Sequence, residues 1–220
     1  MVLLTGPSGV GKSTLAAGLA NTLPSADIIS YGNVLFECQR AEDPQLTYAQ
    51  FRESASRIVA PADIAAADLL VARHICRLRT IVRVILLELH TVTVTEHGFR
   101  ATPFRPVVLR RMRPDGVVHL TARPKDLRRR LAAQSSGRRI QSVNGAEHLA
   151  RLQEQAALLY SCTAGCSLFV IDSAPGPDVV LEHALKCLAG IGISRTVEQN
   201  YDDHVPLPGT ATRRSSLKRK

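Results

Sequence analysis

Gly6-Pro7-Ser8-Gly9-Val10-Gly11-Lys12-Ser13-Thr14 decides the fold, because this stretch satisfies the pattern G-x-x-x-x-G-K-[ST]. Residues 1–5 before it form an apolar run of strand length, and residues 14–20 after it carry apolar side chains at helical spacing. A strand, a glycine-rich loop and a helix in this order build a cradle for phosphate groups. A glycine-rich turn that fits the pattern by accident is the alternative, and it does not account for the flanking strand and helix. The motif therefore predicts a binding site for the phosphates of ATP over Gly6 to Thr14.

Each residue type in this loop has a physical reason. Gly6, Gly9 and Gly11 accept backbone angles closed to other residues, so that successive N–H groups can point at one anion. The helix that follows adds its unpaired N–H groups and the positive end of its dipole. The Lys12 ammonium is expected to reach the β- and γ-phosphates, and the Ser13 hydroxyl is expected to bind Mg²⁺, which prefers oxygen ligands.

Length and composition indicate one globular α/β domain over residues 1–192. The chain has 220 residues, of which 45% are hydrophobic and only 4% aromatic, so it offers few stacking platforms for nucleic-acid bases. The longest apolar run, residues 81–89, is interrupted by Arg83 and Glu88 and is too short to cross a membrane. The chain begins directly with a strand and its five cysteines lack a C-x-x-C pair, which predicts reduced thiols, no membrane partner and a cytoplasmic location.

The net charge of +9 has a local distribution. One cluster of arginines lies at residues 128–130 and 138–139, and a second group of basic residues lies at 213–220. Residues 193–220 combine prolines, polar residues and positive charge without a periodic apolar face, so we expect a disordered basic tail there. Two interpretations of this tail stay open, namely no role beyond solubility and a weak contact with RNA or other polyanions.

Strands and helices alternate along the rest of the chain. Further strands are expected at residues 27–30, 80–89, 117–121 and 168–172, with helical segments between them. This alternation predicts a parallel sheet covered on both faces, with ligands beyond the carboxyl ends of the strands. In the helical region 34–79, five apolar residues are expected in the core: Phe51, Ile58, Ile64, Leu69 and Ile75.

Four segments in the same order resemble a known family, the P-loop nucleoside monophosphate kinases, and most closely the archaeal-type adenylate kinases. The resemblance covers about residues 1–190. Residues 30–35, S-Y-G-N-V-L, are similar to the family's Y-G-D-V-M. Residues 88–103 are similar to its D-T-H-A stretch and the G-Y-L-P-G-L-P loop that follows. Residues 128–139 are similar to its R-R-L-x-D-x-x-R-x-R lid, and residues 147–165 close a helix with Y-x-x-x-T-G as the family does.

This resemblance implies a three-layer P-loop NTPase fold with five parallel strands in the order 2-3-1-4-5 and an arginine-rich lid at about residues 128–145. It further implies an enzyme that moves the γ-phosphate of Mg²⁺-bound ATP to a nucleoside monophosphate, most closely AMP. Lys12, Arg138 and Arg139 are then the groups that stabilise the transferred phosphoryl charge, assisted by Arg129 or Arg130. A solvated helix face is the alternative interpretation of the arginine run.

The acceptor side of the family's site corresponds to Tyr31, Gly32, Asn33 and His90. Each has a structural alternative, since a strand-to-helix turn or a structural histidine would give the same residues. By the same resemblance, Glu88 is expected to act on Mg²⁺ through its water shell, although a carboxylate at a strand end is often structural.

Departures from the family pattern fall on the acceptor side. Asn33 replaces an acidic residue, Asp43 lacks the arginine that follows it in the family unless Arg40 or Arg52 substitutes, and the lid aspartate is Gln134. ATP binding is therefore better supported than AMP specificity. Two alternatives stay open: a P-loop kinase for another small acceptor, such as a different nucleotide, a nucleoside or a metabolite hydroxyl, and a nucleotide-dependent, RNA-associated ATPase.

Overall fold

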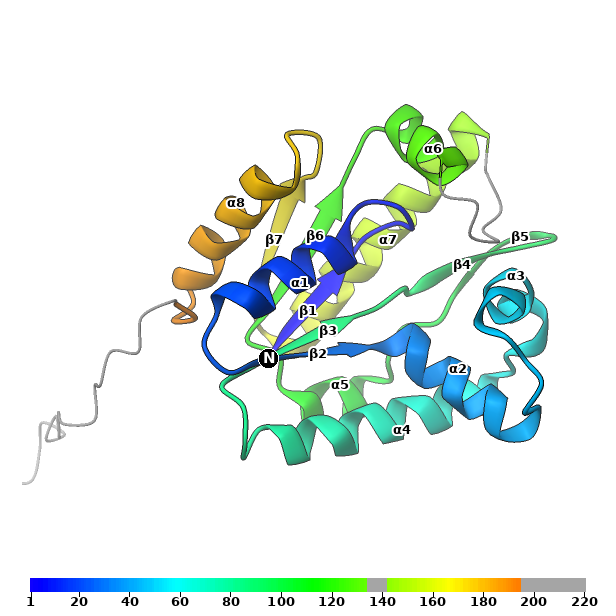
Figure 1. Cartoon of the computed structure of the whole chain (residues 1–220), viewed down its shortest axis with the longest axis horizontal. Coiled ribbons are helices and arrows are strands. Elements are labelled where there is room, and N and C mark those ends of the chain that lie inside the picture. The colour runs from blue at the N-terminus through cyan, green and yellow to red at the C-terminus, as the bar shows by residue number, and fades with distance from the viewer. Residues whose placement is uncertain (134–141, 195–220) are drawn as a thin grey trace, which may run out of the picture.

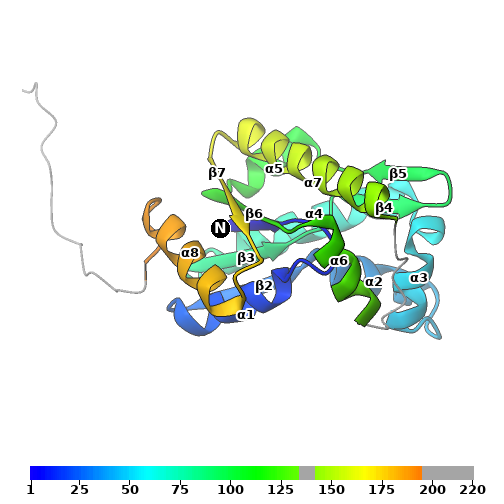
Figure 2. The same ribbon diagram turned by 90° about the horizontal axis from the view of Figure 1, so that it is seen from above.

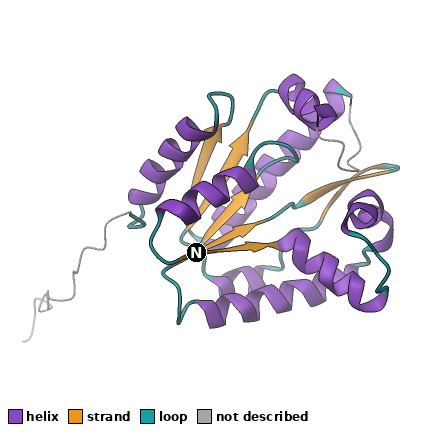
Figure 3. Cartoon of the chain, viewed as in Figure 1, coloured by secondary structure: helices purple, strands orange, loops and turns teal. Residues whose placement is uncertain are grey.

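The computed structural model describes residues 1–133 and 142–194. Its strands are β1 (Val2–Thr5), β2 (Ala26–Ser30), β3 (Val84–Glu88), β4 (Val92–Thr95), β5 (Gly98–Ala101), β6 (Gly116–Thr121) and β7 (Ser167–Asp172). Its helices are α1 (Lys12–Thr22), α2 (Tyr31–Glu42), α3 (Tyr48–Ile58), α4 (Pro61–Leu78), α5 (Pro106–Met112), α6 (Pro124–Ala133), α7 (Val143–Ala164) and α8 (Pro177–Ala189). Figures 1 and 3 show how these helices surround one twisted sheet.

Five parallel strands form the main sheet, in the order β2-β3-β1-β6-β7. This order confirms the predicted P-loop NTPase topology, with β6 and β7 as the fourth and fifth strands of the expected series. Because β1 lies between β3 and β6, its register fixes what surrounds the following loop. Leu4 pairs with Glu88 on one side, and Thr5 pairs with His119 on the other.

Successive side chains of β1 enter two different cores. Leu3 packs with residues of α4, α5 and α7, whereas Val2 and Leu4 pack with residues of α1 and α8. All three side chains are at most 1% exposed. A strand buried on both faces needs this continuous apolar character, because its side chains alternate between the two layers of helices. Figure 2 shows α5 and α7 on one side of the sheet and α1 and α8 on the other.

A second, two-stranded sheet was not predicted from the sequence. Strands β4 and β5 form an antiparallel hairpin, in which Val94 pairs with Phe99 and Thr95 pairs with Gly98. The signal was present, because Val92-Thr-Val-Thr alternates with a period of two and Gly98, at φ 131°, follows the turn. The strand predicted over residues 80–89 begins only at Val84, since residues 79–83 form the turn between α4 and β3.

The expected core of the helical region was only partly right. Phe51 and Ile75 are buried, but Ile58 and Leu69 are 39% and 41% exposed and do not belong to the core. The prediction of a disordered tail concerns residues that, apart from 193 and 194, lie outside the described ranges, and so does the middle of the predicted lid, residues 134–141. None of the helices in the described ranges is both long and apolar enough to span a bilayer.

The central position of β3 leads to a test of stability. Leu86 is fully buried between β1 and β2, so Leu86→Ala should lower the free energy of unfolding by about 2–5 kcal/mol through lost apolar contact and a residual cavity. Ile81 is 74% exposed in the turn before the same strand, and Ile81→Ala should change stability by no more than about 0.5 kcal/mol. Urea unfolding measures both, and equal losses would contradict the placement of β3 at the centre of the core.

Candidate functional site

The loop between β1 and α1 is held in shape by its glycines. Gly6 has φ 134°, and a Cβ placed there would lie 2.4 Å from the carbonyl oxygen of Leu120 on β6. Gly11 has φ 107° and forms the N-cap of α1, so the first N–H groups of that helix face the loop. Residues other than glycine are strained at both φ angles, and at position 6 there is also no space for a Cβ atom. The loop therefore keeps its backbone N–H groups available for an anion.

The Lys12 side chain lies inside this loop and binds two of its carbonyl oxygens. Its Nζ donates hydrogen bonds to the carbonyl oxygens of Gly6 at 2.7 Å and Pro7 at 3.0 Å, and the side chain is only 5% exposed. A buried ammonium group is stable only with such partners. Lys12 lies at the carboxyl end of the parallel strands, so its positive charge is held where phosphate oxygens would bind.

Beneath the loop, Thr5 and His119 join the ends of β1 and β6. The Oγ1 of Thr5 lies 2.9 Å from Nδ1 of His119, and both side chains are buried. Burial, with the nearby charge of Lys12, lowers the pKa of His119 to about 4, so this imidazole is neutral at pH 7. Because the His119 imidazole is neutral, it adds no second positive charge next to Lys12.

Ser13 and Glu88 meet at the ends of α1 and β3. The Oγ of Ser13 donates a hydrogen bond to Oε2 of Glu88 at 3.1 Å. Burial raises the pKa of Glu88, and the Ser13 hydrogen bond and the charge of Lys12 oppose this shift. A hydroxyl and a carboxylate beside a phosphate cradle fit Mg²⁺, which binds hard oxygen ligands and keeps much of its water shell. These two side chains would hold the ion, with nucleotide phosphates completing its ligands.

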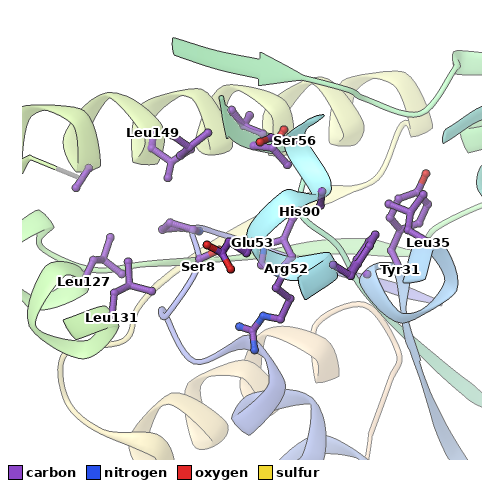
Figure 4. Close-up of a pocket in the computed structure, with 18 of the residues that line it drawn as sticks. Ser8, Tyr31, Leu35, Arg52, Glu53, Ser56, His90, Leu127, Leu131 and Leu149 are labelled. Carbon is purple, nitrogen blue, oxygen red and sulfur yellow. The ribbon is translucent and has the colours of Figure 1, made fainter. Parts of the chain in front are cut away.

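Beside the loop opens a pocket of about 220 Å³. Its walls come from the loop, α2, α3, β4, α6 and α7, as Figure 4 shows. Pro7 and Ser8 of the phosphate loop line it, together with the apolar side chains of Leu35, Phe51 and Leu149. The pocket therefore runs from the phosphate cradle into a largely apolar space large enough for a small molecule.

Tyr31 forms part of this pocket and of a buried polar network behind it. Its hydroxyl donates to Oδ1 of Asp68 at 2.6 Å, and its ring packs edge-on against Phe104 at 5.3 Å between centroids. Burial raises the pKa of Tyr31 and of Asp68. The hydroxyl of Tyr160 accepts hydrogen bonds from Thr91 Oγ1 at 3.1 Å and from the backbone N–H of Phe104 at 3.3 Å. The network thus holds the back wall of the pocket in one arrangement.

Three consecutive arginines on α6 have three different environments. Arg128 lines the pocket, and its Nε is buried without a hydrogen-bond partner in the described ranges. Arg129 is exposed and pairs with Asp126 at 3.0 Å. Arg130 donates to the carbonyl oxygen of Val10 at 3.3 Å and to Ser173, which ties α6 to the phosphate loop. The other two predicted lid arginines, Arg138 and Arg139, lie outside the described residues.

The predicted acceptor residues separate into two groups. Tyr31, Gly32 and His90 line the pocket, whereas Asn33 is exposed on α2 and does not belong to its lining. On the nucleotide side, Thr14 is exposed in the first turn of α1.

Sequence reasoning did not assign two further residues of the pocket. Arg52 extends from α3 toward the phosphate loop helix in Figure 4, with its Cζ 5.6 Å from the centre of the Tyr48 ring. It had been considered only as a substitute for a missing arginine. Arg128 was hidden in a run of identical residues. The helical period distinguishes its direction from that of its neighbours, but only the packing of α6 shows which direction faces the pocket.

The loop, the sheet order and the pocket together define a P-loop nucleotide-binding protein with a kinase-like fold. A family model described as an AAA domain matches residues 5–147, which is more than half of the chain. The chain belongs to this AAA domain family of P-loop proteins.

One relative and two solved structures are similar to this chain. An adenylate kinase from Methanopyrus kandleri is 23% identical over 176 residues, which cover 79% of this chain and 88% of the relative. The structure of a sugar kinase from a Janibacter species has a TM-score of 0.53 at 15% identity and covers 88% of this chain and 96% of its own. A gluconokinase from Sinorhizobium meliloti has a TM-score of 0.50 at 15% identity, with coverages of 86% and 91%. These structures share the fold with this chain.

The Ser13–Glu88 pair predicts opposite effects of Glu88→Gln on stability and on activity. Because burial raises the pKa of Glu88, its ionised form lowers the stability of the ligand-free protein at pH 7, and this penalty disappears as the pH falls below that pKa. Glu88→Gln should therefore raise the free energy of unfolding at pH 7, with the difference from wild type shrinking toward pH 4.5. Turnover with Mg²⁺-ATP should fall on the order of 10²-fold, because the carboxylate that would act on the Mg²⁺ water shell is lost.

Chemical unfolding at several pH values and a turnover assay measure these effects. Glu154→Gln, at an exposed position of α7, provides the control and should leave both quantities nearly unchanged. A loss of stability in Glu88→Gln at pH 7 would contradict the assigned cost of burying this carboxylate.

Proposed function

We propose that this protein transfers the γ-phosphate of ATP to a nucleoside monophosphate, with AMP as the first acceptor to test. The observation that carries this proposal is that Ser8 of the phosphate loop lines the same pocket as the aromatic and aliphatic side chains of α2 and α3. A donor phosphate in the loop and an acceptor in the pocket would meet at their phosphate ends. The name of the Methanopyrus relative, adenylate kinase, supports the same reaction.

The end of the pocket next to the loop suits an acceptor that carries a phosphate. Arg52 and Arg128 enter from α3 and α6, and His90 enters from the end of β3. Arginine side chains bind phosphate oxygens through two N–H groups at once. The buried Nε of Arg128 has no acceptor within the described ranges, and a phosphate oxygen would satisfy it.

The far end suits a flat, largely apolar group. Tyr48 and Phe51 belong to an aromatic cluster on α2 and α3, and Leu35 and Val92 are further apolar side chains in the lining. A planar nucleobase can bury both faces against such walls. A polyhydroxyl acceptor would bring many hydroxyl groups to these walls, and each hydroxyl buried without a partner is unfavourable.

The transfer itself requires placement and charge stabilisation more than covalent chemistry by the protein. Lys12 would exchange its contacts with the carbonyl oxygens of Gly6 and Pro7 for contacts with the β- and γ-phosphates. Mg²⁺ held through Ser13 and Glu88 would neutralise negative charge on the phosphate oxygens. Arg138 and Arg139 are proposed as lid residues that cover the transferred group and exclude water, with Arg128 in place of Arg129 as their neighbour on α6.

A small polyhydroxyl acceptor is the second candidate. The sugar kinase and the gluconokinase share the fold, and their names suggest a hydroxyl group as acceptor. Asn33 stands where the nucleotide kinases carry an acidic residue and is exposed, which favours a different use of this part of α2.

An assay with radiolabelled ATP against AMP, CMP, UMP, GMP, gluconate and hexoses distinguishes the two candidates. Transfer to gluconate or a hexose, with none to a nucleotide, would contradict the first proposal.

Arg52 provides a test of the acceptor end. Arg52→Gln should raise the KM for the monophosphate about 10- to 100-fold, because one charge-assisted contact with its phosphate is worth roughly 1.5–3 kcal/mol. The KM for ATP should change less than about twofold. Steady-state kinetics with each substrate varied in turn measures both constants.

Arg40→Gln is the matched control, because Arg40 is the other arginine considered for this role, and it is exposed and paired with Glu37 at 2.7 Å. Its substitution should leave both KM values near wild type. A larger effect of Arg40→Gln than of Arg52→Gln would contradict the role of Arg52 and assign the acceptor phosphate to α2 instead of α3.

A further inference from the structure

Arginines gather at the edge of the sheet opposite the phosphate loop. Residues 69–87 and 97–114 contain nine arginines and no aspartate or glutamate. Seven of the nine lie at the carboxyl ends of α4 and α5 or in the turns that lead into β3 and β6, and all seven are exposed. These seven residues, which we call the arginine face, are Arg73, Arg77, Arg79, Arg83, Arg110, Arg111 and Arg113.

Contacts of Arg79 join the carboxyl ends of α4 and α5, so the arginines at these two helix ends lie on one side of the molecule (Figure 1). The guanidinium group of Arg79 donates hydrogen bonds at 2.6 Å to the carbonyl oxygens of Met112 and Arg113, which end α5. Arg73 and Arg77 are four residues apart on α4 and therefore point to the same side, with about 5–6 Å between their Cβ atoms. Figure 1 shows α4 and α5 together along one side of the molecule.

The backbone at Arg113 adopts a conformation that is unfavourable for a residue with a side chain. Arg113 forms the C-cap of α5 at φ 47°, a left-handed conformation that glycine adopts far more readily. A residue with a side chain costs about 1 kcal/mol there. The fold therefore tolerates strain at a position where this side chain adds to the positive surface.

The charge exceeds what the fold itself needs. Each helix carboxyl end carries about half a negative charge, so the two ends together neutralise about one of the seven arginines. Asp115, the nearby exposed carboxylate, pairs with the amino group of Met1. The ion pairs of the described ranges involve other basic residues. A surplus of roughly six positive charges remains for a partner.

We propose that the arginine face binds the phosphodiester backbone of a nucleic acid. Arginine binds phosphate in a fork geometry, and the face contains no lysine. It carries no aromatic side chain either, so binding through phosphates rather than by base stacking is expected, with little dependence on sequence. Ile81 is the large exposed apolar side chain within it, which offers little area for insertion into a bilayer.

This inference goes beyond the proposed phosphotransfer and is independent of it. The face lies where β3 and β6 begin, whereas the phosphate loop follows the end of β1, and parallel strands place these points at opposite edges. The described chain ends near the same edge, since Ile191 lies against Gly116 at the start of β6.

The test measures binding of the full-length protein to a fluorescein-labelled single-stranded RNA of about 30 nucleotides between 50 and 200 mM KCl. The variant replaces Arg73, Arg77, Arg110 and Arg111 with glutamine and keeps Arg79, which holds α5. The matched control replaces four basic residues that already have carboxylate partners, Arg40, Arg57, Arg151 and Lys186. Both variants lose the same net charge.

We expect the slope of log K against log[KCl] to become shallower by about 3 in the arginine-face variant, since each lost phosphate contact removes about 0.7 from a single-strand slope. The control should keep the wild-type slope, and a second RNA of unrelated sequence should bind alike. Equal losses in the two variants, or binding to phosphatidylserine vesicles without binding to RNA, would overturn the proposal.

A phosphotransfer assay on the same preparations separates this inference from the proposed function. The arginine-face variant should keep wild-type turnover, and saturating Mg²⁺-ATP should change the RNA affinity less than twofold. Wild-type protein that binds RNA in this way but transfers no phosphate would refute the proposed function alone.

Discussion

The close approach of Gly6 to the carbonyl of Leu120 is the constraint on which the site depends. It brings the chain out of β1 in a direction that only glycine permits, and Lys12 then returns across the loop to bind the carbonyl oxygens of Gly6 and Pro7. Since β1 is the central strand, the neighbouring strands deliver Glu88 and His119 to the same place by register alone. The chemistry of the loop is therefore a consequence of the parallel sheet.

Burial changes the pKa of two polar side chains next to this loop, Glu88 and His119. Glu88 has a raised pKa and His119 a lowered one, and in both cases burial is the main cause. Desolvation of the Glu88 carboxylate is unfavourable in the ligand-free protein, and a bound cation would offset this cost. The neutral imidazole of His119 avoids a second positive charge under Lys12. The charges of Lys12 and Glu88 would thus fit the proposed Mg²⁺-bound nucleotide.

Much of the fold could be predicted from the sequence, because buried parallel strands are apolar runs separated by helical patterns. The β4–β5 hairpin was missed since a resemblance to a loop was given more weight than the two-residue period of its side chains. The site could be predicted only where a backbone motif defines it. Arg128, Arg129 and Arg130 have the same chemistry but point into the pocket, to solvent and to the phosphate loop, because a helix turns by about 100° per residue. The sequence gives this rotation, but the packing of α6 decides which of the three directions faces the pocket.

Specificity for a proposed acceptor would depend on α2, α3 and β4, where the sequence contains no motif as clear as the phosphate loop. The phosphate loop serves any P-loop phosphotransferase, whereas α2, α3 and β4 supply the walls that a particular acceptor must fit. Tyr31 links these walls to the core through Asp68, whose helical spacing from Val71 and Ile75 places it on the buried face of α4. The Tyr31–Asp68 pair is buried at the back of the pocket, while the α3 wall carries the half-buried Arg52. A change of acceptor in such a pocket therefore requires changes in α3 before changes in the sheet.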